Sequence, residues 1–279
     1  MNSLKFLSTI ILLFTILGAS HAQGFQGVAT YKTDRKMKIT LDSTSVSGDM
    51  QKEIMQRMRK QFQKEFTLTF NQYESTWKQE AALSSPSAAA GNVMISVIGS
   101  GGGSDVLYKN TKESRFAEKT DLFGKIFLVK DSLSKPEWKL TNETKGIGNY
   151  TCYKATWEQK SKKITYVNNE KQETEEMETR VITAWYTPEI PINNGPDDYW
   201  GLPGLILEVN ENGDRLMLCS KIVMNPKETI TIAEPKKGKK VTKKEYQKIA
   251  EKKAEEMMKN FQNNRSGDGE NTISIKIGG

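Results

Sequence analysis

The feature that most constrains the fold is a turn-rich segment that leads straight into an apolar run. Residues 195–204 (GPDDYWGLPG) combine glycines and prolines with Tyr199 and Trp200, and residues 205–209 (LILEV) follow at once. Proline fixes φ, glycine accepts backbone conformations closed to other residues, and a short apolar run is typical of a buried strand. We therefore expect a rigid, aromatic-anchored bend, here called the corner (residues 195–204), that feeds a core strand.

A β-hairpin is predicted immediately after the corner. Asn212-Gly213 separates 205–209 from a second apolar run at 216–220, and both turn residues tolerate positive φ. A two-residue turn there pairs Val209 with Leu216 and Leu207 with Leu218. Because side chains alternate across a strand, the predicted inward face consists of Leu205, Leu207, Val209, Leu216 and Leu218.

The rest of the chain is also rich in short segments typical of strands. They are separated by turn residues and by little helix, and 160–178 reads as an exposed, charged hairpin around Asn168-Asn169. This spacing indicates an antiparallel sheet. The predicted strands are 27–41, 66–77, 106–108, 125–130, 138–140, 150–158, 181–186 and 227–232.

Two amphipathic helices are predicted, over residues 49–65 and 243–261. Apolar residues recur at helical spacing in both, and Thr242 with Glu245 has the pattern of a capping box. The expected fold is mainly β (α+β): a curved antiparallel sheet or half-barrel with these two helices packed against it, in outline like periplasmic lipoprotein-carrier half-barrels. Residues 23–279 are expected to form one domain, with 84–105, rich in Ser, Ala and Gly, as a flexible loop.

The amino terminus is typical of a secretory signal peptide over residues 1–22. Lys5 precedes an apolar run, and Ser20-His21-Ala22 supplies the small residues that a signal peptidase reads, so cleavage is expected before Gln23. No later apolar run reaches the roughly 20 residues of a membrane span. We therefore expect an exported protein of the periplasm or the extracellular space, without a transmembrane segment in the mature chain.

Loss of the signal peptide would remove His21, which is the single histidine of the sequence. This excludes nucleophile–histidine pairs and histidine-ligated zinc from the mature chain, so we expect no metal and no cofactor. The formal net charge is +7, and lysines concentrate at 235–259 with glutamates between them. That pattern favours a solvated helix face over a surface that binds anionic lipid or glycan. These lysines include no base-stacking motif, which argues against nucleic acid binding.

Cys152 and Cys219 each lie in a predicted strand. In an oxidising compartment they would form one disulfide. Two buried thiols remain an alternative, and so does a soft-metal pair, although the latter needs further ligands.

Several segments together resemble the GLPGLI family of exported Bacteroidetes proteins. The corner with its flanks (185–191, WYTPEIP; 199–208, YWGLPGLILE) carries most of the likeness, and 66–70, 138–141 and 150–155 add to it. The resemblance implies an envelope or secreted location and an antiparallel β-rich domain. The family brings no established activity that could be transferred.

These features lead to a prediction of function. We expect a non-enzymatic binding or carrier module for an apolar or glycan ligand of the cell envelope, with the ligand held by Trp185, Tyr199, Trp200, Leu202 and Pro203. One alternative is a hydrolase that uses carboxylates, drawn from Asp197, Asp198, Glu189 and Glu208. Another is an accessory partner of an outer-membrane receptor.

Overall fold

The computed structural model describes residues 25–35, 63–80, 105–167, 170–228 and 230–263. The predicted signal peptide, the predicted flexible loop up to Ser104, and most of the predicted helix 49–65 lie outside these ranges. The strands are β1 (Gln26–Arg35), β2 (Lys64–Asn71), β3 (Glu74–Gln79), β4 (Val106–Asn110), β5 (Arg115–Leu122), β6 (Lys125–Ser132), β7 (Lys139–Ile147), β8 (Tyr150–Val167), β9 (Glu170–Thr187), β10 (Leu205–Glu211), β11 (Arg215–Met224) and β12 (Lys239–Val241).

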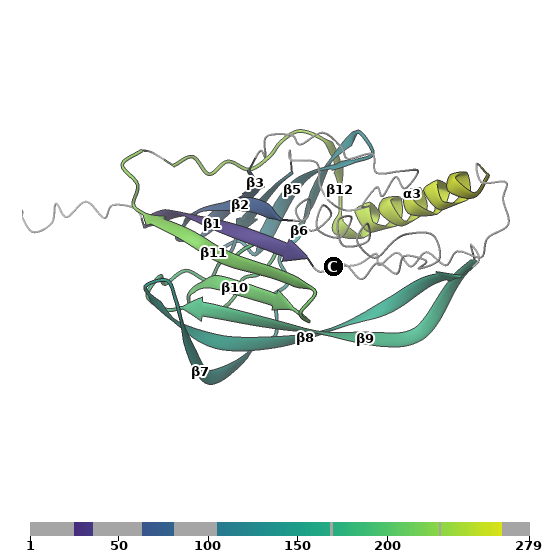
Figure 1. Cartoon of the computed structure of the whole chain (residues 1–279). Helices are drawn as coiled ribbons and strands as arrows, with labels where there is room; N and C mark the ends of the chain where they lie inside the picture. Colours follow the sequence, from purple (N-terminus) through teal and green to yellow (C-terminus); the bar gives the residue numbers. More distant parts are fainter. Residues whose placement is uncertain (1–24, 36–62, 81–104, 168–169, 229, 264–279) are drawn as a thin grey trace, which may run out of the picture.

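These strands form one 12-stranded sheet in the order β12-β6-β5-β4-β3-β2-β1-β11-β10-β9-β8-β7. Neighbours pair antiparallel except β12, which lies parallel to β6. Over the described residues the sheet is open, with β12 and β7 at its edges. Figure 1 shows its strong twist and the long arm that β8 and β9 form beyond β10. The predicted mainly β class is therefore confirmed.

One helix, α3 (Lys243–Asn263), is present in the described part of the chain, where two had been predicted. Its capping box is confirmed: the Thr242 N–H donates to Glu245 Oε2 (2.7 Å), and the Glu245 N–H donates to Thr242 Oγ1 (3.2 Å). Tyr246 packs edge-on against Phe127 of β6, with 5.6 Å between ring centroids. Where the predicted helix 49–65 reaches described residues, Gln63 is not helical and Lys64 begins β2. No described helix has the length and apolar character needed to cross a membrane.

Two strand predictions need correction, and one strand was not predicted. The segment 66–77 is a hairpin and not one strand, because Asn71 Oδ1 accepts hydrogen bonds from the N–H groups of Tyr73 (2.9 Å) and Glu74 (2.7 Å) and so closes a tight turn. β5 was not predicted, since its charged residues alternate with few large apolar ones. The predicted strand 227–232 contains no strand among its described residues, and the chain pairs again only at β12.

The β10–β11 hairpin is shifted by one residue from its predicted register. Asn212 and Gly213 have positive φ (55° and 78°), as expected, but the closing pair is Glu211 with Arg215 and leaves a three-residue loop. A slip of one residue exchanges the two faces of a strand. Met217 is therefore fully buried, whereas Leu218, predicted to face inward, is 36% exposed.

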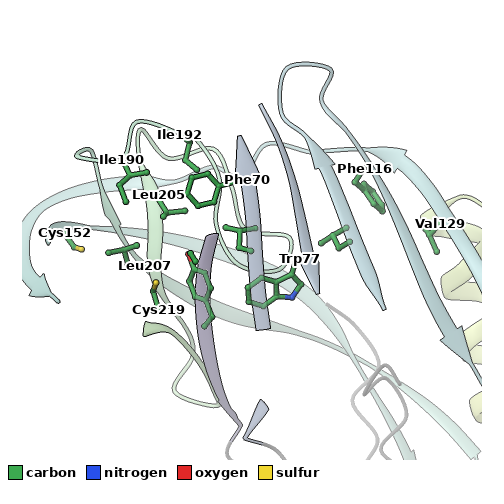
Figure 2. Close-up of a cluster of buried hydrophobic side chains, with 14 of the residues drawn as sticks. Phe70, Trp77, Phe116, Val129, Cys152, Ile190, Ile192, Leu205, Leu207 and Cys219 are labelled. Carbon is green, nitrogen blue, oxygen red and sulfur yellow. The ribbon is translucent and has the colours of Figure 1, made fainter. Parts of the chain in front are cut away.

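The main apolar cluster extends along the sheet from β6 to β8. Figure 2 shows Ile190 and Ile192, from the segment between β9 and β10, beside Phe70 and Leu205. A second cluster gathers around Ile206 and Met217 and includes residues of the corner. The segment between β9 and β10 thus contributes to both apolar clusters.

Candidate functional site

One buried lysine fixes the corner in place. Lys109, on β4, is fully buried, and its Nζ donates hydrogen bonds to the backbone carbonyls of Gly195 (2.8 Å), Asp197 (2.5 Å) and Tyr199 (3.2 Å). Burial lowers the pKa of Lys109 to about 8, although the carboxylates of Asp197 and Asp198 favour its charged form. A desolvated ammonium is tolerated only with such partners, so β4 and the corner depend on each other.

Two glycines of the corner are required for different reasons. The sequence predicts that Gly204 has a backbone conformation that other residues cannot adopt. The structure instead places the glycine with positive φ (92°) at Gly201. At Gly204 a Cβ would lie 2.2 Å from the carbonyl oxygen of Thr187. Gly204 therefore allows two backbone segments to meet.

Three of the predicted ligand-binding residues are core residues. Tyr199 is 6% exposed, Trp200 5% and Leu202 1%. The Trp200 indole N–H donates to the carbonyl of Ser134 (3.2 Å), and the Trp138 indole N–H donates to the carbonyl of Trp200 (2.8 Å). These contacts tie the corner to the segment that leads into β7.

The other two predicted ligand-binding residues lie apart from that buried group. Trp185, on β9, packs against the main apolar cluster, and Lys145 Nζ lies 4.4 Å from the centroid of its ring. Pro203 is exposed. The structure thus does not bring the five residues together, and a shared ligand-binding role for them stays a prediction.

The four carboxylates of the predicted hydrolase are also separated. Glu208 forms an ion pair with Lys145 (2.7 Å), and Glu189 Oε1 accepts a hydrogen bond from the Thr151 N–H (2.9 Å). Burial raises the pKa of the nearby Cys152 thiol, and the two glutamates add to that effect while Lys145 opposes it. The two aspartates of the corner belong to a different group.

That group has a member which the sequence did not indicate. Glu118, on β5, is half-buried, and desolvation together with the carboxylates of Asp197, Asp105 and Asp198 raises its pKa to about 7. The pKa of Asp198 is also raised. The larger cause is desolvation of the carboxyl, and the negative charge of Asp197 is the second. Part of the Asp198 side chain remains exposed to solvent. A carboxyl that titrates near neutral pH can donate or accept a proton.

Cationic side chains gather at one end of the buried face of the sheet. On β1 the alternate residues Tyr31 and Thr33 are buried, and the same face ends in the exposed Arg35. Arg35 lies opposite Arg215 of β11, and Thr33 lies opposite Lys64 of β2. We call this group the cationic rim: Arg35, Lys64, Arg180 and Arg215.

Two members of the cationic rim are paired with carboxylates. Arg215 donates to Glu211 (3.0 Å) and to Asp197 (2.7 Å), and Arg180 lies 3.6 Å from Glu211. Burial alone would lower the pKa of Arg215, but the two carboxylates raise it. This network joins the corner to the middle of β9, the end of β10 and the start of β11.

The other two members have no such partner. Among the described residues, neither Arg35 nor Lys64 forms a hydrogen bond or an ion pair through its cationic group. The pKa of Arg35 is lowered by desolvation and then by Arg215, while Glu211 and Asp197 oppose that shift. The pKa of Lys64 is lowered by desolvation and then by Arg35 and Arg215. Asp105 opposes the shift at Lys64 without an ion pair.

An aromatic pair adjoins the cationic rim. Phe66 follows Lys64 on the same face of β2, is half-buried, and stacks on Trp77 of β3 with 4.8 Å between ring centroids and 3° between ring planes. Tyr31 meets the same indole edge-on at 5.3 Å. Cation and apolar surface therefore lie next to each other along β2.

Both cysteines are free thiols in the structure. Both thiols are buried, and the disulfide between them stays a prediction for the exported protein. Burial raises the pKa of Cys152 to about 11 and that of Cys219 to about 12, which makes both poor nucleophiles. In the part of the chain that the structure describes, no group of acidic, histidine or cysteine side chains could hold a metal ion.

Sequence reasoning missed Lys109, Glu118 and the cationic rim. Alternation along β1 was a usable signal for Arg35, because it places an arginine on the face that carries Tyr31. The proximity of Arg35, Lys64 and Arg215 depends on the pairing of β1 with strands on both sides, and no local pattern encodes that.

A family described as "Protein of unknown function (Porph_ging)" matches residues 138–208, a stretch that runs from the start of β7 through the corner into β10. This family occurs in Bacteroidetes-type proteins and is not the GLPGLI family itself. No curated protein matches the chain.

Among solved structures, the chain is similar to PNGF-II in two crystal forms. The C2 form has a TM-score of 0.47 and 16% identity, and the P21 form has a TM-score of 0.47 and 17% identity. In each comparison 82% of this chain is covered, but only 33% of the PNGF-II chain, so the protein spans about a third of that relative's length.

Proposed function

We propose that this protein is an exported, non-enzymatic binding module for an apolar ligand of the cell envelope. One observation carries the proposal: the half-buried ring of Phe66, stacked on the buried Trp77, lies beside cations that form no ion pair among the described residues. An apolar surface next to unpaired charge is typical of a place where a ligand completes the contacts. The signal-like amino terminus supports the location.

The test is to identify what copurifies with the protein. Protein exported by its native host would be analysed by native mass spectrometry, and then again after solvent extraction. We expect an apolar molecule on the wild type and on Leu140→Ser, because Leu140 is 57% exposed on β7 and lies away from the aromatic pair. The molecule should be lost from Phe66→Ser. A protein that carries nothing in any preparation would contradict the proposal.

A hydrolase remains the second candidate, because Glu118 titrates near neutral pH beside Asp197 and Asp198. Turnover of aryl esters or aryl glycosides by pure protein, abolished in Glu118→Gln, would establish it. No turnover, or turnover that survives this substitution, would reject a role for the group. The interaction with an outer-membrane receptor stays a prediction, to be tested by crosslinking and pull-down.

A further inference from the structure

Two members of the cationic rim, Arg35 and Lys64, form no ion pair among the described residues. Arg35 and Arg215 lie directly opposite each other on β1 and β11. Like charges facing each other across a strand pair are destabilising unless something neutralises them. Arg215 has its own carboxylates, Glu211 and Asp197, at 3.0 and 2.7 Å.

The remaining acidic groups nearby are already engaged. Asp105 accepts hydrogen bonds from Thr120 Oγ1 (3.2 Å) and from the Asp121 N–H (3.1 Å). Asp34 belongs to the opposite face of β1, because side chains alternate along the strand, and it has interactions of its own. Arg35 and Lys64 therefore form a pair of cations without an ion-pair partner among the described residues, although Glu211 and Asp197 act on Arg35, and Asp105 on Lys64, from a distance.

The surroundings of this pair define the kind of anion that would fit. Moving inward from Lys64 along β2, the next residue on the same face is Phe66, which is stacked on Trp77. An inorganic anion would satisfy the charges but would leave the half-buried Phe66 ring in contact with water. A molecule with one acid group and an apolar body satisfies both.

We propose that Arg35 and Lys64 bind the carboxylate of an acidic amphiphile whose apolar chain lies along Phe66 toward Trp77. This inference rests on the proposed function, since it names the chemical class of the ligand. The lowered pKa values of Arg35 and Lys64 agree with it, because a bound anion would favour the charged forms of both groups.

The probes are decanoate and 1-decanol, which differ in the acid group. Binding to the full exported chain would be measured by calorimetry and by the fluorescence of the tryptophans. We expect decanoate to bind at least about 10-fold more tightly than decanol, with a preference that weakens as salt is added. In the double variant Arg35→Gln/Lys64→Gln, decanoate should bind only as tightly as decanol.

A matched control removes the same number of positive charges elsewhere. Lys32 and Lys78 are exposed on the opposite face of β1 and β3, so Lys32→Gln/Lys78→Gln should keep the preference. The Arg35→Gln change relieves repulsion with Arg215, so the double variant should fold with an unchanged or higher Tm. Each single variant, Arg35→Gln or Lys64→Gln, should lose part of the preference for decanoate and serves as a second check.

The outcomes separate this inference from the proposed function. Equal binding of decanoate and decanol to the wild type would overturn the acid site and leave the binding module standing. A preference that survives in the double variant would also overturn the assignment to Arg35 and Lys64. If neither probe binds the wild type, the inference fails, and the copurification experiment alone decides the proposed function.

Discussion

At the scale of single residues, two glycines next to or within strands have different roles. Gly204 precedes β10, and a Cβ there would meet the backbone of Thr187, whereas a Cβ on Gly146 of β7 would meet nothing within 4 Å. The composition of the corner predicts that its glycines matter. The structural reason, a second backbone segment at Gly204, depends on the pairing of β9 with β10 and could not be predicted from the sequence.

Gly204→Ala is expected to destabilise the protein by about 2 to 4 kcal/mol, because two backbone segments must move apart. Gly146→Ala, in an open position without positive φ, should stay within about 0.5 kcal/mol of the wild type. Chemical denaturation of both variants measures the difference. Equal stabilities would show that the close approach at Gly204 does not exist.

Glu118→Gln is expected to make stability less dependent on pH. The pKa of Glu118, about 7, lies above that of an unfolded glutamate, so the folded state binds the proton more tightly and loses stability as pH rises toward 7. The loss between pH 5 and 8 should be on the order of 1 to 2 kcal/mol, since the residue is partly hydrated.

The measurement is a urea titration of the wild type and Glu118→Gln at both pH values. The exposed Glu228→Gln serves as the control and should follow the wild type. If wild type and Glu118→Gln show the same pH dependence, the interpretation of Glu118 is wrong.

Lys109→Met keeps a similar side-chain length but removes the donor for three carbonyls of the corner. We expect a loss of about 2 to 4 kcal/mol, because buried carbonyls would be left without partners. Amides of the corner should exchange with solvent much faster, while those of the β8–β9 hairpin stay unchanged. Lys78→Met, which replaces an exposed lysine, is the control. If the amides of the corner exchange as slowly in Lys109→Met as in Lys78→Met, Lys109 does not hold the corner in place.

At the scale of elements, local signals predicted structure well where one short motif decides it. Thr242 and Glu245 define the start of α3, and Asn212-Gly213 defines a turn. Prediction failed where the pairing of strands distant in the sequence determines the structure. The register of β10 against β11 differs by one residue because the loop closes at Glu211 and Arg215. β12 pairs in parallel with β6 through only three residues, a contact without a local signature.

Thr242→Ala is expected to fray the first turn of α3 and to cost about 1 kcal/mol, because the side-chain acceptor for the Glu245 N–H is lost. Lys244→Ala, in the same turn but without a capping role, should leave helicity unchanged or slightly raised. Circular dichroism at 222 nm and amide exchange over the first turn report the change. Identical exchange in the two variants would exclude the capping box as the determinant of the start of α3.

At the scale of the whole molecule, the two cysteines form no covalent link between β8 and β11. The buried thiols, with raised pKa values, should not react with iodoacetamide at pH 8 in the native protein, and both should react after unfolding without reductant. Mass spectrometry counts the labels. An unfolded, unreduced protein without labels would show that the exported protein carries the disulfide after all.

The candidate site illustrates how far sequence reasoning reaches at this scale. The corner was found because its residues are contiguous, and its aromatic residues are buried as core residues. The cationic rim was not found, because Arg35, Lys64, Arg180 and Arg215 come from β1, β2, β9 and β11. They lie near one another only after most of the sheet has paired.

β1 lies in the middle of the sheet order, between β2 and β11, and the Tyr31 hydroxyl donates a 2.7 Å hydrogen bond to the carbonyl of Ile206, 175 positions later. In a chain that emerges from its amino terminus, one edge of β1 therefore stays unpaired until β11 (Arg215–Met224 of 279 residues) is available. Closure of so long a loop makes folding slow, and the unpaired edge of β1 is open to pairing with other chains. A truncation ahead of β11 would leave the midpoint of the sheet incomplete and not merely its margin.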